Sequence, residues 1–195
     1  MSSHHFVKEG QEPALLIING VSFERAQPLL EWSPLIVVSS QALEKVLSWG
    51  IRIDAVIIQS DEELTVKQRF VQFQNVDLIV VRQPEDLLAE CVRFVRKKMH
   101  SELNILCHSL EEIFPSLEEA GDMRVAVLAD DYRWITTRSY RKWVSAGTQF
   151  NLRAASGDAK ILLSGFIRRG ETLLAEKDGF VAVFSPQALW IGESY

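Results

Sequence analysis

Residues 14 to 128 alternate between continuous apolar runs and amphipathic patterns, and this alternation restricts the fold more than any other feature of the chain. A strand covered by helices on both faces loses the polar–apolar alternation of a half-exposed strand and is an unbroken apolar segment in the sequence. Six segments have this character and the length of a strand. They are residues 14–18, 35–38, 55–58, 77–81, 103–107 and 125–128.

Three stretches between these runs repeat their apolar residues at intervals of three or four, as amphipathic helices do. They cover residues 22–32, 41–49 and 85–98, and Gly50 follows the second as a candidate C-cap. Buried strands alternating with helices predict a parallel sheet with helices on both faces. We therefore expect a doubly wound α/β domain at residues 14–125, after a flexible tail at residues 1–13.

The pattern changes after residue 131 to short runs rich in β-branched and aromatic residues, with glycines between them. Runs of this kind predict antiparallel strands, and we expect a small antiparallel β-sandwich at residues 126–195. The runs are residues 134–137, 150–153, 161–163, 172–174 and 180–184. Aromatic residues in this part could stack on a planar ligand or bury a dimer interface; they are Trp143, Phe150, Phe184 and Trp190.

Composition excludes several classes of function. A net charge of −5, with one basic cluster at residues 93–98, argues against binding to nucleic acid, and that cluster is typical of a solvated helix face. No apolar run approaches the roughly 20 residues of a membrane-spanning helix, and the amino terminus lacks the apolar centre of a signal peptide, so we expect a cytoplasmic protein that binds no membrane. Cys91 and Cys107 are interpreted as buried hydrophobic residues.

The loops after the strands are the candidate binding positions, because ligands of open α/β sheets bind beyond the carboxyl ends of the strands. Neither GxGxxG nor GxxxxGK[ST] occurs in these loops, which excludes a dinucleotide fingerprint and a P-loop at the level of motif. The residues that follow the first three strands are instead Asn19-Gly20, Ser39-Ser40-Gln41 and Gln59-Ser60-Asp61.

These loops, in this order, resemble the thiamine pyrophosphokinase family. The chain has IING at 17–20, VVSSQA at 37–42, WGIRIDAVIIQSDE at 49–62 and PEDLLAE at 84–90, where family sequences typically have ANGE, ADGGAN, PDxIIGDxDS and KTD. The resemblance implies a parallel α/β domain followed by a β-sandwich that joins two subunits into a homodimer. It also implies ATP, magnesium and the transfer of pyrophosphate from ATP to thiamine, and hence a nucleotide or thiamine-like small molecule as partner.

Position by position, the match to the family is partial. Ser39 and Ser40 stand where the family has Asp-Gly, and Gln59 stands where it has an Asp. The metal ligands that the resemblance implies are Asp61 and Asp86. The cofactor contacts that it implies are Asn19, Ser39, Ser40 and Gln59. No residue is assigned a catalytic role.

The substitutions bear on the chemistry, because pyrophosphoryl transfer needs magnesium held by carboxylates. Serine and glutamine oxygens are weaker ligands, so we expect catalysis to be weakened or lost. The alternative is a non-catalytic ligand-binding or interaction module on the same fold. If the chain is an interaction module whose cleft is closed, Gln59 and Glu62 should fill the cleft with mutual hydrogen bonds. Asp61 and Asp86 could also be helix caps.

Overall fold

A computed structural model describes residues 12–63, 76–154 and 160–194. The chain divides into two compact units, one that runs to Val125 and one that begins at Ala126. Residues 1–11 of the expected tail lie outside the described residues.

The first unit contains the strands and helices that the apolar runs and helical patterns predicted, with ends that differ by a few residues. A short helical segment between residues 110 and 120 was not predicted. The strands are β1 (Ala14–Ile17), β2 (Ile36–Ser39), β3 (Ala55–Gln59), β4 (Asp77–Val81) and β5 (Glu102–Leu106). The helices are α1 (Phe23–Leu30), α2 (Ser40–Leu47), α4 (Leu87–Lys97) and α5 (Leu110–Ile113), with the 3₁₀ helices η1 (Pro84–Asp86) and η2 (Phe114–Ala120).

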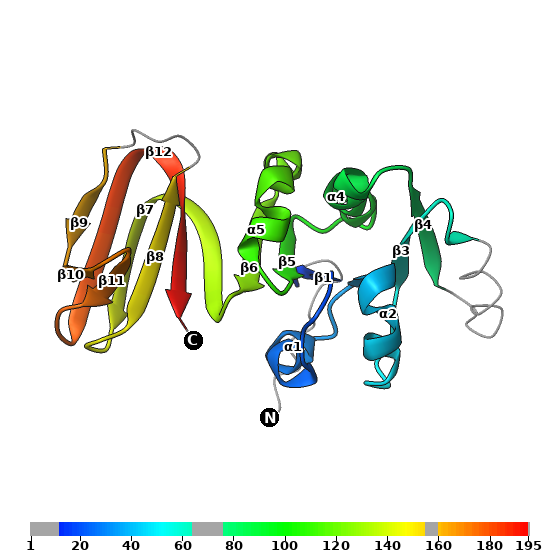
Figure 1. Ribbon diagram of the computed structural model, residues 1–195, viewed down its shortest axis with the longest axis horizontal. Helices are drawn as coiled ribbons and strands as arrows, with labels where there is room; N and C mark the ends of the chain where they lie inside the picture. Colours follow the sequence, from blue (N-terminus) through cyan, green and yellow to red (C-terminus); the bar gives the residue numbers. More distant parts are fainter. Residues whose placement is uncertain (1–11, 64–75, 155–159, 195) are drawn as a thin grey trace, which may run out of the picture. The chain divides into compact units, whose positions relative to one another are not determined.

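These strands form a parallel sheet in the order β5-β1-β2-β3-β4. Helices α1 and α2 lie on one face of this sheet, and α4 and α5 lie on the other (Figure 1). Strands β1 and β2 are buried along their whole length, which is why their sequences lack polar alternation. The prediction of a parallel sheet between two helical layers is therefore correct for these five strands.

The second unit is antiparallel. Its strands are β7 (Tyr132–Val144), β8 (Gln149–Ala154), β9 (Leu162–Ser164), β10 (Phe166–Arg169), β11 (Thr172–Ala175) and β12 (Gly179–Ser194). Strand β12 pairs with β7, β8 and β9, and β11 pairs with β8 and β10. The core of this unit is apolar and centres on Phe150, with Leu173, Val181 and Leu189 around it.

Strand β6 (Arg124–Ala129) continues the hydrogen-bonded order from β5 and pairs antiparallel with β7. Within the described residues, hydrogen bonding thus joins twelve strands in one mixed sheet. The sequence predicted an α/β fold with parallel and antiparallel parts, and this coarser description holds. The run at 125–128 forms β6, which pairs antiparallel and not parallel with the next strand, β7. The separate sandwich domain at residues 126–195 stays a prediction.

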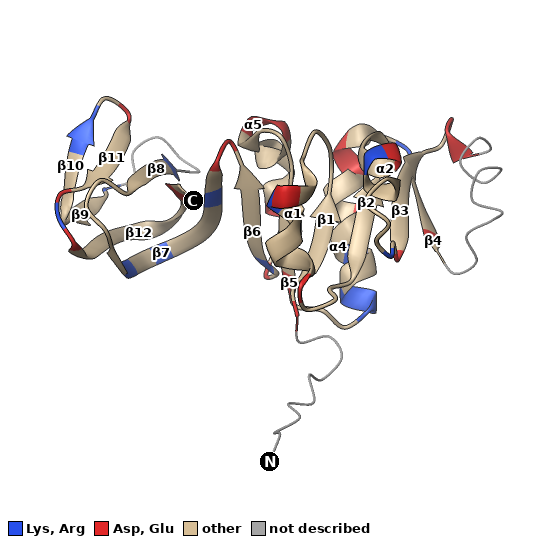
Figure 2. Cartoon of the chain, turned by 90° about the horizontal axis from the view of Figure 1, so that it is seen from below, with Lys and Arg blue, Asp and Glu red and all other residues tan. Residues whose placement is uncertain are grey.

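Charged residues lie mainly outside the buried strands. Figure 2 shows β1, β2 and β3 without charged residues, whereas helices α1, α2 and α4 carry them. Among the described residues, no helix is long and apolar enough to cross a membrane.

Candidate functional site

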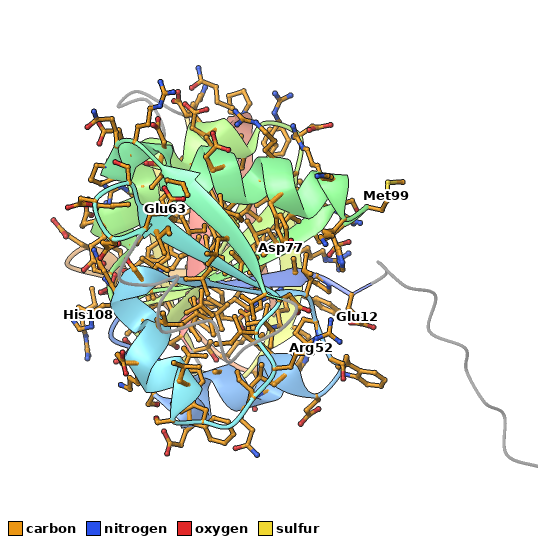
Figure 3. The ribbon with its side chains drawn as sticks, turned by 90° about the vertical axis from the view of Figure 1, so that its right-hand side faces the viewer. Glu12, Arg52, Glu63, Asp77, Met99 and His108 are labelled. Atoms are coloured by element: carbon orange, nitrogen blue, oxygen red, sulfur yellow. The ribbon has the colours of Figure 1, made fainter. Side chains whose placement is uncertain are left out.

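The carboxyl ends of the parallel strands lie at one edge of the first unit. Glu63, which follows β3, and His108, which follows β5, lie on one side in Figure 3. Residues that precede or begin strands, such as Glu12, Arg52 and Asp77, lie on the opposite side. This common direction follows from the parallel pairing, and it brings the predicted loops together at one edge.

A cavity of about 300 Å³ opens at this edge, and we call it the strand-end cleft. Its apolar walls come from the ends of β1, β3 and β4 and from helices α4 and α5. Seven polar residues line it, and they are Asn19, Ser39, Ser40, Gln41, Gln59, Glu112 and Ser116. All four of the predicted cofactor contacts, Asn19, Ser39, Ser40 and Gln59, are among them. A volume of this size is at the lower end of the range for small-molecule sites.

Ser39 ends β2 and is almost completely buried. Its hydroxyl donates a hydrogen bond to the carbonyl of Ile18, the residue after β1. The side chain therefore fixes the ends of two neighbouring strands to each other. A buried hydroxyl that is used in this way contributes little as a ligand group.

Asn19 connects the end of β1 to the turn before α5. Its Oδ1 accepts a hydrogen bond from the backbone N–H of His108 at 2.9 Å, and its Nδ2 donates to Oε2 of Glu112 at 2.6 Å. Gly20 follows with a φ of +52°, and a Cβ added there would lie 3.3 Å from Cβ of His108. The Asn19-Gly20 pair is therefore a packed connection as well as part of the cleft wall.

Gln59 and Glu62 close the end of β3. The backbone N–H of Gln59 donates to Oε2 of Glu62 at 3.0 Å, and the backbone N–H of Glu62 donates to the carbonyl of Gln59 at 3.0 Å. The expected alternative had these two residues filling the cleft with mutual hydrogen bonds. The hydrogen bonds between them are made by the backbone of Gln59 and not by its side-chain amide. Gln59 lines a cavity that remains open beside these bonds.

The carboxylates that matched the family pattern lie outside the cleft wall. Asp61 and Asp86 are exposed, and neither is among the residues that line the cavity. Asp86 occupies the N-cap position of α4, but its side chain makes no capping hydrogen bond. Asp54 lies at the amino end of β3, where its Oδ2 accepts from the backbone N–H of Ile36 at 2.9 Å. The predicted metal pair of Asp61 and Asp86 stays a prediction.

The cleft wall does not fit a magnesium ion held by carboxylates. Magnesium prefers hard, anionic oxygens in a near-octahedral arrangement. The wall offers serine hydroxyls, glutamine amides and the single carboxylate of Glu112, which already accepts from Asn19. Among the described residues, no group of three or more His, Cys, Asp and Glu side chains is placed to hold a metal ion.

The second unit has an exposed apolar face, which sequence reasoning anticipated only in part. On this face Phe180 pairs with Trp143 across β12 and β7, and Phe184 pairs with Leu162 of β9. These four side chains are between 52% and 60% exposed, and the Arg141 guanidinium lies 4.5 Å from the Phe180 ring centre. We call the four side chains of Trp143, Leu162, Phe180 and Phe184 the apolar face. The other two aromatic candidates, Phe150 and Trp190, are buried.

Tyr140, Lys142 and Glu193 form a polar cluster beside a smaller cavity of about 140 Å³ in the same unit. The hydroxyl of Tyr140 donates to Oε2 of Glu193 at 2.9 Å, and Nζ of Lys142 lies 2.6 Å from Oε1. Burial, together with the hydrogen bond to Glu193, raises the pKa of Tyr140 above its usual range. The hydroxyl is thus held as a hydrogen-bond donor.

Comparisons with known proteins give a match in structure alone. No family model matches the sequence, and no curated protein matches it. The structure resembles thiamin pyrophosphokinase of Geobacillus thermodenitrificans with a TM-score of 0.64 and 12% identity, covering 93% of this chain and 97% of that one. For thiamin pyrophosphokinase of Candida albicans the TM-score is 0.62 and the identity 8%, covering 94% and 89%.

A protein from Lactobacillus plantarum gives a TM-score of 0.65 at 9% identity, covering 94% of this chain and 99% of that one. The likeness therefore extends over both units of the described chain. It confirms, at the level of fold, the resemblance that the strand-end loops indicated in the sequence.

Proposed function

We propose that this chain is a thiamine pyrophosphokinase-like protein that binds a small molecule in the strand-end cleft and has weakened or lost the metal-dependent transfer of pyrophosphate. The observation that carries the proposal is the chemistry of the strand ends. Ser39 and Gln59 end β2 and β3 inside the cleft wall, at positions where the resemblance implies carboxylates. The ligand is a nucleotide or a thiamine-like molecule.

The physical reason is the charge that the reaction demands. Transfer of pyrophosphate from ATP to a hydroxyl develops negative charge on the leaving and bridging oxygens, which enzymes stabilise with a metal ion or with cationic side chains. Replacing an aspartate by serine or glutamine removes one formal charge from the cation's surroundings at each position. Asp61 and Asp86 are the carboxylates left to hold magnesium, and both are exposed.

The test is a turnover assay in parallel with a binding assay. Purified protein is incubated with ATP, thiamine and either magnesium or manganese, and AMP and thiamine diphosphate are quantified against a heat-inactivated control. The proposal expects product near the control level, together with saturable binding of ATP or thiamine by calorimetry. Rapid turnover would contradict the loss of catalysis, and the absence of binding to ATP, to thiamine and to the unphosphorylated nucleoside adenosine would contradict the ligand-binding role.

A second candidate role, assembly into a homodimer, is favoured by the apolar face of the second unit. Monomeric proteins rarely expose a contiguous group of large apolar side chains, and such groups often mark interaction surfaces. Trp143, Phe180, Phe184 and Leu162 form such a group on the paired strands β7, β12 and β9.

Sedimentation velocity measures this role directly. We expect a dimer for the unmodified chain and a monomer for Phe180→Asp. Phe23→Asp, at a partly exposed phenylalanine of the first unit, is the matched control and should remain dimeric. A monomeric unmodified chain at micromolar concentration would contradict the dimer.

A further inference from the structure

The strand-end cleft differs from a polyphosphate site in the distribution of its charge. Of the fifteen described residues that line it, Glu112 alone carries a formal charge at neutral pH. The other lining residues are apolar or carry hydroxyl or amide groups. The formal charge of the described wall is therefore −1, with no cationic side chain among these fifteen residues.

A negative wall disfavours a triphosphate. Proteins neutralise phosphate groups with Lys or Arg side chains, or with a metal ion that carboxylates hold in place. The described wall supplies neither, and the Glu112 carboxylate repels an anion that enters the cleft. The wall is better matched to a ligand that carries no negative charge.

The remaining polar groups define what such a ligand must offer. Asn19, Ser39 and Glu112 already form hydrogen bonds within the protein. The polar side chains of the wall outside these bonds are two hydroxyls and two amides. They are Ser40, Gln41, Gln59 and Ser116. Hydroxyls and primary amides both donate and accept hydrogen bonds, and amides pair with the edges of heterocyclic rings.

The apolar walls and the volume restrict the ligand further. Ile18 after β1, Pro84 of η1 and Leu87 of α4 line the cavity and are not fully buried, so they present apolar surface to it, which favours an apolar ring over a flexible polar chain. The cavity of about 300 Å³ corresponds to roughly ten water molecules at the volume of liquid water. The ligand is therefore small.

We infer that the strand-end cleft selects an uncharged heterocyclic molecule with hydroxyl groups, a nucleoside, and discriminates against the phosphorylated forms of the same molecule. This inference builds on the proposed function, because it requires that the cleft bind a small molecule. It replaces the nucleotide of the proposed function by its unphosphorylated part, and it gives the cleft a selectivity opposite to that of an ATP-dependent enzyme.

The test compares matched pairs of compounds by isothermal titration calorimetry with the full chain. Adenosine and cytidine are titrated alongside ATP and CTP, with and without magnesium. We expect at least one nucleoside to bind at least about ten-fold more tightly than its triphosphate under both conditions, a difference of about 1.4 kcal/mol. A triphosphate that binds as tightly as its nucleoside, or more tightly, would overturn the inference and leave the ligand-binding proposal standing. If neither nucleosides, triphosphates nor thiamine bind, both are overturned.

A variant locates the bound nucleoside. Gln59→Glu replaces one amide of the wall by a carboxylate of the same shape and removes a hydrogen-bond donor. We expect it to weaken nucleoside binding about five-fold, the order of one hydrogen bond. Gln83→Glu makes the same chemical change at an exposed residue outside the wall and should bind like the unmodified chain. Equal binding by the two variants would show that the nucleoside does not occupy the strand-end cleft.

Discussion

The hydrogen bond from Asn19 to Glu112, which we call the bridge, can be tested by replacing its donor with an acceptor. In Asn19→Asp the amide that donates to Glu112 becomes a second carboxylate, whereas the oxygen that accepts from His108 is kept. The variant thus preserves the shape of the side chain and changes one donor into an acceptor. Two negatively charged groups then face each other across the 2.6 Å of the original bond.

The expected loss of stability has two parts. Removing a hydrogen bond to a charged group costs about 1.5 kcal/mol at the low end of the usual range, which suits an exposed pair. Repulsion between two unit charges at 2.6 Å in water adds about 1.6 kcal/mol. We therefore expect the unfolding free energy to fall by about 3 kcal/mol, or the melting temperature by roughly 6–12 °C for a chain of this size.

The assay is urea denaturation at pH 7, followed by circular dichroism, on a set of four proteins. They are the unmodified chain, Asn19→Asp, Glu112→Gln and the double variant, which exchanges the acid and the amide between the two positions. The double variant should recover most of the lost stability, because the new amide can donate to the new carboxylate. An Asn19→Asp protein as stable as the unmodified chain, or a double variant no better than the single one, would refute the bridge.

Three further changes test other parts of the structure. Gly20→Ala should lower the unfolding free energy by about 1–2 kcal/mol in urea denaturation because its φ is +52°, and by more than Gly170→Ala, where φ is also positive but an added Cβ would meet nothing within 4 Å. Phe150→Ala removes a side chain that is 0% exposed and should cost about 3–5 kcal/mol in the same measurement. Because the pKa of Tyr140 is raised above 10.0, the unfolded chain loses that proton first, so stability falls as the pH rises above about 10. Urea denaturation at about pH 8 and about pH 11 should show a smaller fall in the free energy of unfolding for Tyr140→Phe than for the unmodified chain. An equal fall in the two proteins would contradict the raised pKa.

The edge at which the cleft lies could be predicted from the sequence because it depends on local patterns. Ser39 and Gln59 each follow an unbroken apolar run, and parallel strands bring their carboxyl ends to the same edge. Continuous apolar runs are also what identified the parallel sheet. No long-range information was needed for either inference.

The far wall of the cleft could not be predicted in this way. Glu112 meets Asn19 across 93 positions of sequence, and its short helix was not anticipated. A signal was present, because Ser109 and Glu112 have the spacing of a capping box and the Ser109 side chain accepts from the backbone N–H of Glu111. Proximity between such distant residues depends on the packing of whole elements.

Strands β7 and β12 of the second unit are longer than the runs at 134–137 and 180–184 that predicted them, for a different reason. Strand β7 carries four Lys or Arg side chains in thirteen residues, and its exposed positions alternate imperfectly with its buried ones. Charged residues on an exposed sheet face have the composition of a loop, although their backbones are paired throughout. The pairing with β12 is what fixes their conformation.

The hydrogen bond from Ser39 to Ile18 limits how an additional acidic residue could be engineered into the strand-end cleft. Introducing an acid at Ser39 would place a charge in a nearly solvent-free position and break the tie between β1 and β2. An engineer would therefore have to rebuild the anchoring of both strands before a catalytic acid at that position could be tolerated. Directed evolution from this sequence should accept acids at the more accessible Gln59 first.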